Sequence, residues 1–314
     1  MTRPPDDPNR RVEADTAEQA RVAADQLSRV NGPLELHAAV LALLLPPGSQ
    51  RAARAWQVEC AAVAGAQALR DIVAGLPAAA RLPWFETLLA RLRSQPVAAR
   101  KGLLEATRRL MAARGSVRPI DRLHWLAMRQ HLGDTARASA PARAATSVSQ
   151  LPQADVYAIA TFSAFLSRMV PVAEAATPAG LAAPAVPAIP AVPVEPAATD
   201  VPTAPATARA APNPGAAWYD SVMAPWAHRA EIPPLALPDT DGIVDALHTL
   251  QALTWMQRPV LARGWVSAAR EHSHDGRLSD GAADALRLCC TLLDSPLPPE
   301  LDSHYSASTP EAPP

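Results

Sequence analysis

The densest group of side chains that could do chemistry is the segment EHSHDG at positions 271–276. Two imidazoles and two carboxylates lie close together here, on Glu271, His272, His274 and Asp275. Such groups are ligands for divalent metal ions, so weak metal binding is one hypothesis for this segment. The competing interpretation is a helix that ends in a turn, because histidine is favoured near the negative end of the helix dipole. We expect the helix terminus and keep the four residues as weak candidates for a metal site.

Two aromatic pairs are candidates for contact with a protein partner. His124 and Trp125 lie on a predicted helix. His131 follows on the same helix, about 10 Å further along its axis, which is too far for the two imidazoles to hold one small ion alone. Trp218 and Trp226 lie beside a proline-rich segment and would form a second, exposed patch. The alternative position for these tryptophans is the core, because most tryptophans of the chain lie on apolar helical stripes.

The sequence carries no recognisable catalytic constellation. It has no His-Glu-x-x-His zinc motif, no Gly-x-Ser-x-Gly nucleophile motif and no glycine-rich phosphate loop. Cys60 falls within an apolar helix, and the neighbours Cys289 and Cys290 cannot easily pair with each other. We therefore expect a non-enzymatic protein without a cofactor, in a reducing intracellular setting.

Charge and hydropathy argue against nucleic-acid binding and against a membrane span. The 29 basic and 30 acidic residues give a net charge of −1, so no global field attracts polyanions. The N-terminal residues lack the apolar core of a signal peptide, and prolines interrupt the longest apolar stretch. We expect a cytoplasmic protein that is not secreted.

Apolar residues at helical spacing predict an all-α protein, a bundle of two helical blocks joined by a Pro/Ala-rich linker. Pro83 and Pro96 stand where two of the helices are expected to begin. The linker composition favours extended conformers that cannot bury a core. The expected organisation is a disordered N-terminus (1–13), an N-terminal block (14–133), a loop and helix (134–170), the disordered linker (171–214), a C-terminal block (215–305) and a disordered tail (306–314).

Two segments in different blocks share a helix–glycine–helix pattern. The first covers residues 103–132 and the second covers residues 260–293. In each, a helix rich in alanine, leucine and arginine runs to a glycine, Gly115 or Gly276, and an aliphatic residue follows two positions later. This pattern indicates partial internal repetition of a helical unit.

Residues 69–132, which include RLPWFETLLARLRS and GSVRPID, resemble the C-terminal cytosolic region of bacterial M48-class membrane metallopeptidases. In that region, RLP and a leucine-rich helix are followed by Asp-Gly-x-Val-x-x-x-Glu, and the whole builds a helical module like that of the TerB tellurite-resistance proteins. Residues 40–57, 275–288 and 292–301 share the resemblance. Here Arg114 replaces the acidic residue before the glycine, and Asp121 stands where Glu is usual.

The resemblance implies two TerB-like blocks that act as a protein-interaction module in a bacterium. The implied partner is a membrane metallopeptidase or another envelope protein, which would place the chain peripherally at the inner membrane. The peptidase half of the family, with its zinc motif and membrane helices, is missing from this sequence. A second hypothesis is therefore a regulatory part detached from an M48-class peptidase, and a third is a weak divalent-metal-responsive binder.

Overall fold

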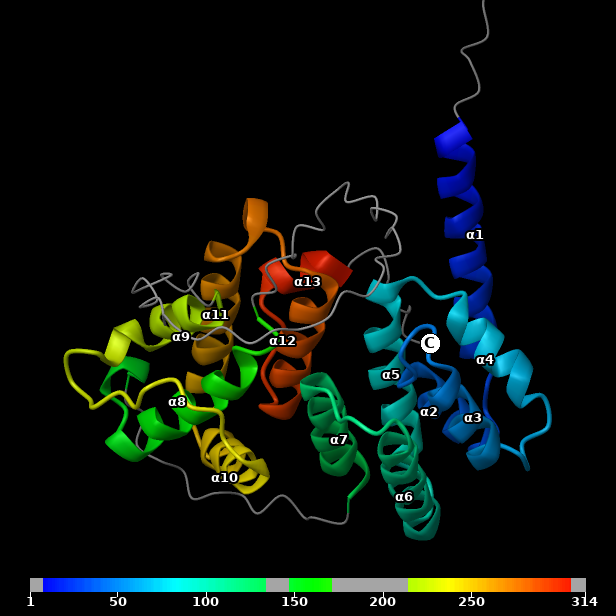
Figure 1. Cartoon of the computed structure of the whole chain (residues 1–314), viewed down its shortest axis with the longest axis horizontal. Coiled ribbons are helices and arrows are strands. Elements are labelled where there is room, and N and C mark those ends of the chain that lie inside the picture. The colour runs from blue at the N-terminus through cyan, green and yellow to red at the C-terminus, as the bar shows by residue number, and fades with distance from the viewer. Residues whose placement is uncertain (1–7, 134–146, 171–213, 306–314) are drawn as a thin grey trace, which may run out of the picture.

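The computed structural model describes residues 8–133, 147–170 and 214–305, and every regular element in these ranges is a helix (Figure 1). The predicted all-α class is confirmed. The elements are α1 (Pro8–Ser28), α2 (Pro33–Leu43), α3 (Gln50–Glu59), α4 (Ala66–Ala74), α5 (Ala78–Leu92), α6 (Val97–Ala113), α7 (Pro119–Leu132), η1 (Val148–Gln150), α8 (Gln153–Leu166), α9 (Pro214–Met223), η2 (Ala224–Trp226), α10 (Thr240–Gln251), α11 (Gln257–Glu271), η3 (His274–Gly276), α12 (Asp280–Leu292) and α13 (Pro299–Tyr305).

Two helices begin earlier than the sequence predicts. α1 begins at Pro8, so residues 8–13 are helical rather than disordered, and Pro8 takes the first position, where a helix does not need its missing N–H. α5 begins at Ala78 after Pro77 and contains Pro83, which is buried within the helix. The other segments expected to lack structure, namely 1–7, 171–213, 306–314 and most of the loop after Gly133, lie outside the described residues.

The buried residues form one continuous core that includes both predicted blocks. Two apolar helices, α2 and α8, each pack against several others in this core. α2 contacts α4, α5 and α6, and α8 contacts α9 and α10. Figure 1 shows α2 to α6 on one side, α8 to α11 on the other, and α7, α12 and α13 between them. α12 packs on α7 and α5, so the two sets of helices meet through these elements.

The carboxyl end of α2 is buried, and the backbone that follows cannot supply donors for all of its last carbonyls. The Leu45 N–H still donates to the Ala42 carbonyl oxygen at 3.0 Å, but Pro46 and Pro47 come next, and a proline has no N–H with which to satisfy the remaining carbonyls of the helix end. Two arginines donate to these carbonyls instead. Nη2 of Arg81, on α5, donates to the carbonyl oxygens of residues 42, 43 and 45 at 3.5, 3.4 and 3.2 Å. Nη2 of Arg114, which follows α6, donates to the Leu44 carbonyl oxygen.

Arg114 also joins α6 to α7. Its Nη1 lies 2.9 Å from Oδ1 of Asp121, and both side chains are almost completely buried. Asp121 accepts a further hydrogen bond from the Arg118 backbone N–H at 3.1 Å, which is the capping interaction that begins α7. One buried guanidinium therefore links the end of α2 to the turn between α6 and α7.

The two helix–glycine–helix segments fold as the sequence predicts. α6 and α7 flank Gly115, and α11 and α12 flank Gly276. Both glycines have positive φ, at 89° and 66°, a region that a residue with a Cβ enters only with strain. The second helices of the two segments, α7 and α12, pack on each other.

A cluster of charged and polar groups lies where α5 meets α12 and α13. Nε of Arg287 lies 2.8 Å from Oε2 of Glu86, and Thr291 Oγ1 donates to the other carboxylate oxygen. The Arg287 guanidinium also lies over the Tyr305 ring, 4.5 Å from its centroid. The Tyr305 hydroxyl donates to Oδ1 of Asp284 at 2.9 Å. Burial raises the pKa of Asp284 to about 7.

We expect Arg114→Met to lower the free energy of unfolding by about 2–4 kcal/mol, because it leaves the buried Leu44 carbonyl without this donor and removes the buried partner of Asp121, whose carboxylate keeps only its bonds to Arg118. Chemical denaturation measures the change. Arg109→Met, in α6 just before Arg114, is the control, because the Arg109 side chain is 58% exposed and the loss of its ion pair with Glu59 should have little effect. Equal effects of the two substitutions would contradict the role given to Arg114.

We expect Asp284→Asn to become progressively more stable than the wild type as the pH rises. The raised pKa means that the folded chain keeps a proton that the unfolded chain releases. The contribution of Asp284 to the stability of the fold is therefore fully present below about pH 4 and is lost as the pH rises to about 7. Above that pH the variant should be more stable by about 1–3 kcal/mol. Denaturation of both proteins across this range tests it, with the exposed Asp245→Asn as control. A stability difference that does not vary with pH would contradict the raised pKa.

Candidate functional site

The four candidate metal ligands do not converge in the structure. α11 ends at Glu271, as the helix-terminus interpretation predicts. The Nε2 atom of His272 is 2.7 Å from Oγ of Ser221, and His274 instead pairs with Asp275, at 2.8 Å, on the exposed surface. Among the described residues, no three histidine, cysteine, aspartate or glutamate side chains are grouped in a way that could hold a metal ion.

The pair His124 and Trp125 is only partly exposed. The His124 ring packs edge-on against Phe85, with centroids 5.0 Å apart, and its Nδ1 lies 3.0 Å from the Ile120 carbonyl oxygen. Burial lowers the pKa of His124 to about 4, so the imidazole is neutral at physiological pH. The guanidinium of Arg108 lies over the Trp125 ring, 5.4 Å from its centroid. Packing within the fold thus accounts for much of the surface of this pair.

The expectation that Trp218 and Trp226 form an exposed patch is wrong. Trp218 is 0% exposed, and its indole N–H donates to the Trp265 carbonyl oxygen at 3.3 Å. Trp226 is 4% exposed, and its indole N–H donates to the Val148 carbonyl oxygen at 2.8 Å. Each indole can be buried without losing a hydrogen bond, because a backbone carbonyl on a distant element accepts from its only donor.

Trp226 nevertheless forms part of the wall of an apolar groove. The groove has a volume of about 590 Å³, which is in the range of small-molecule and peptide side-chain sites. None of its lining residues is charged, and they come from η1 and the residue before it, from α9 and η2, and from residues 254–265, which include the first half of α11. The lining residues are Ser147, Val148, Ser149, Val222, Pro225, Trp226, Thr254, Met256, Gln257, Val260, Leu261, Gly264 and Trp265.

The floor of the groove is rigidly held. Trp265 is 1% exposed, and its indole N–H donates to Oγ of Ser163 at 3.0 Å. Its ring packs against Phe162 of α8, with centroids 5.8 Å apart. The wall formed by η1 is fixed by the hydrogen bond from Trp226 to Val148. A preorganised apolar surface of this kind loses little conformational entropy when a ligand binds.

One edge of the groove exposes large apolar side chains to solvent. Met256 and Val260 line it and are 58% and 56% exposed, and Trp255 beside them is 78% exposed. Met256, Val260 and Gly264 follow at intervals of four residues, so they share one face at the start of α11. A Cβ added at Gly264 would have no atom within 4 Å, so this face is open at Gly264.

Sequence reasoning missed this edge, although a signal was present. The apolar stripe of α10 that includes Ile243, Leu247, Leu250 and Leu253 is buried as expected. Trp255 and Met256 follow at once but fall off the spacing of that stripe. Large apolar residues that continue past the end of a buried stripe have no place in its core, which is a reason to expect them on the surface.

The lining of the groove contains no histidine, cysteine, carboxylate or amine that could activate its serine and threonine hydroxyls. The cysteines lie elsewhere and are buried. Burial raises the pKa of Cys60 and of Cys290 to about 12, so neither is a thiolate near neutral pH. In the part of the chain that the structure describes, no helix has the length and apolar character needed to cross a membrane.

Comparisons with known proteins return no similarity on which to base a function. The chain matches no protein-family model, no curated protein and no solved structure. Functional inference therefore depends on the residues and on their arrangement.

We expect Gly264→Ala to raise the free energy of unfolding by about 0.5–1 kcal/mol, because alanine favours the helix and the site has room for its methyl group. Gly102→Ala in α6 is the matched control, since a Cβ there also meets no atom within 4 Å. Gly264→Trp should also fold, with its indole in the groove. A loss of stability in the variants at position 264, but not at position 102, would show that the groove is not open.

Proposed function

We propose that this chain is a non-enzymatic helical interaction protein that binds an amphipathic helix of a protein partner in the apolar groove. The observation that carries the proposal is the uncharged groove whose edge exposes Trp255, Met256 and Val260. Isolated apolar residues on a surface are ordinary, but an exposed group next to a groove is typical of an interaction site.

The shape of the groove favours a helix as the ligand. Gly264 leaves space next to Val260 on the exposed face, so a partner backbone can approach α11 closely. Met256 adds a flexible side chain that can adapt to the shape of an incoming apolar group. The lining offers no charge to pair with a ligand, so the contacting face of the partner must be uncharged. Apolar side chains at intervals of three and four residues on a helix meet these requirements.

The identity of the partner is suggested by the sequence resemblance alone. Residues 69–132 resemble the cytosolic region of M48-class membrane metallopeptidases, so we propose such a peptidase, or another envelope protein, as the partner. The chain would then act on the cytoplasmic side of the inner membrane as a TerB-like accessory module. The alternative, a regulatory part detached from its peptidase, requires a neighbouring reading frame that encodes His-Glu-x-x-His and membrane helices.

The test places a photo-cross-linking amino acid at position 260 of the full chain in its native host. We expect one discrete adduct, and peptide mapping should locate the cross-link on the apolar face of a helix in the partner. The second substitution Gly264→Trp should abolish the adduct because its indole fills the groove. Gly102→Trp, in which the same side chain stands on α6, should leave the yield unchanged.

Three outcomes would contradict the proposal. The first is a diffuse set of adducts that Gly264→Trp does not alter. The second is a cross-link to a charged or irregular segment of the partner. The third is a cross-link only to residues 171–213 of the same chain, which would make that segment the ligand of the groove and leave no external partner there.

A further inference from the structure

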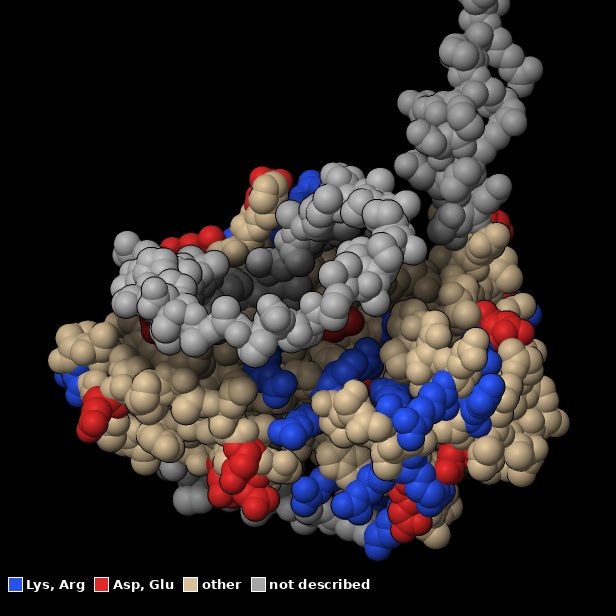
Figure 2. All heavy atoms as spheres, in the orientation of Figure 1, with Lys and Arg blue, Asp and Glu red and all other residues tan. Residues whose placement is uncertain are grey.

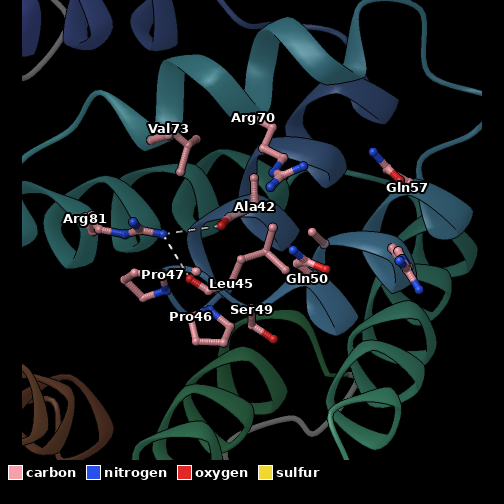
Figure 3. Close-up of a pocket in the computed structure, with 14 residues that line it drawn as sticks. Ala42, Leu45, Pro46, Pro47, Ser49, Gln50, Gln57, Arg70, Val73 and Arg81 are labelled. Atoms are coloured by element: carbon pink, nitrogen blue, oxygen red, sulfur yellow. Dashed lines mark hydrogen bonds between the residues drawn. The ribbon is translucent and has the colours of Figure 1, made fainter.

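A second hollow lies among α2, α3, α4 and α5, on a different part of the molecule from the apolar groove. It has a volume of about 570 Å³. Three arginines on three different helices line it: Arg54 on α3, Arg70 on α4 and Arg81 on α5. Figure 3 shows Arg70 and Arg81 directed toward the pocket from separate elements, on either side of Ala42.

The positive charge of this pocket is not balanced within it. No aspartate or glutamate is among its lining residues. Arg54 and Arg70 make no hydrogen bond or ion pair with any of the residues that the structure describes. Arg81 donates to the carbonyl oxygens at the end of α2, and the partial negative charge of that helix end offsets only part of its full positive charge. Asp284 acts electrostatically on Arg81 but lies outside the pocket lining.

The remaining lining groups are neutral, and several are hydrogen-bond donors. Ser49 and Gln50 stand at the start of α3, so the positive end of that helix dipole borders the pocket. Gln57 on the next turns of α3 adds a side-chain amide. The apolar part of the lining consists of aliphatic and proline residues, and it includes no aromatic ring on which a base could stack.

We propose that this pocket binds a phosphate ester with a polar, non-aromatic body. Guanidinium groups from separate helices match the oxygens of a phosphate through paired hydrogen bonds. The volume exceeds what a single phosphate group requires, and the amides and the hydroxyl can meet the hydroxyl groups of the attached body. The absence of an aromatic ring from the lining disfavours a nucleotide.

The test is isothermal titration calorimetry of the full chain with glucose 6-phosphate at constant ionic strength. We expect saturable binding with a dissociation constant below about 1 mM, and no binding of glucose. Arg70→Gln and Arg54→Gln should each weaken binding by about tenfold or more, because each removes a charge-assisted contact. Both substitutions should leave the thermal midpoint near the wild type, since neither arginine has a partner to lose among the described residues.

Arg51→Gln is the matched control. Arg51 is an exposed arginine on α3, like Arg54, but it does not line the pocket. Its substitution should change the affinity by less than about twofold if pocket contacts, rather than general positive charge, hold the ligand. An equal loss of affinity in Arg51→Gln, Arg54→Gln and Arg70→Gln would overturn the site.

The phosphate could belong to a soluble ester or to a lipid headgroup, and a vesicle arm distinguishes the two. Vesicles that contain phosphatidic acid are compared with vesicles of phosphatidylcholine alone. Binding of the soluble ester alone, weakened by Arg70→Gln, supports the site with a soluble ligand. Binding of phosphatidic acid vesicles alone, with the same sensitivity, supports it with a lipid ligand. Binding of neither, or binding that Arg54→Gln and Arg70→Gln do not weaken, overturns the proposal.

Discussion

The structure depends on how the buried carboxyl end of α2 is satisfied. A helix leaves its last carbonyls without partners, and two prolines after α2 remove the backbone donors that usually follow. An unsatisfied buried carbonyl costs about 1–3 kcal/mol, so several together would offset much of the stability of a domain. Arg81 and Arg114 supply the missing donors from α5 and from the end of α6. Their positive charges also oppose the negative end of the α2 dipole.

These two arginines have further consequences for the surrounding elements. Arg114 pairs with Asp121 at the start of α7, and α7 is the helix on which α12 packs. Arg114 and Asp121 are the two positions where this chain departs from the pattern it resembles, and the structure shows that they contact each other. Arg81 places a positive charge at the edge of the second hollow, on the other side of Ala42 from Arg70 (Figure 3). In Figure 2, Lys and Arg side chains gather over the part of the molecule that contains α6 and α7, whereas few charges of either sign lie over α8 and α9. The two proposed sites differ in character, because the pocket among α2 to α5 is lined by arginines and the groove beside α11 is uncharged.

Local sequence rules predicted the helices better than they predicted the surface. The positive φ of Gly115 and Gly276 and the helices around them follow from spacing and residue type, which are local properties. Pro83 lies inside α5 rather than at its start because the burial of the surrounding apolar residues outweighs the roughly 3 kcal/mol that an internal proline costs. Trp218 and Trp226 were expected at the surface because of the proline-rich segment nearby, but contacts with Trp265 and Val148 bury them. Those contacts join residues distant in the chain, and no local pattern encodes them.

The two candidate sites are likewise products of tertiary structure. The groove brings η1 against η2 and α11, and the basic pocket takes one arginine from each of three helices.

Hydrogen exchange tests the central claim, that a partner occupies the groove, most directly. It would compare the chain purified from its host with partner bound and the same chain after the partner is removed. The account predicts slower exchange with partner bound in residues 148–150 and 256–264, and unchanged exchange in α6 and α7. Slower exchange confined to α6 and α7, with no change beside the groove, would contradict it.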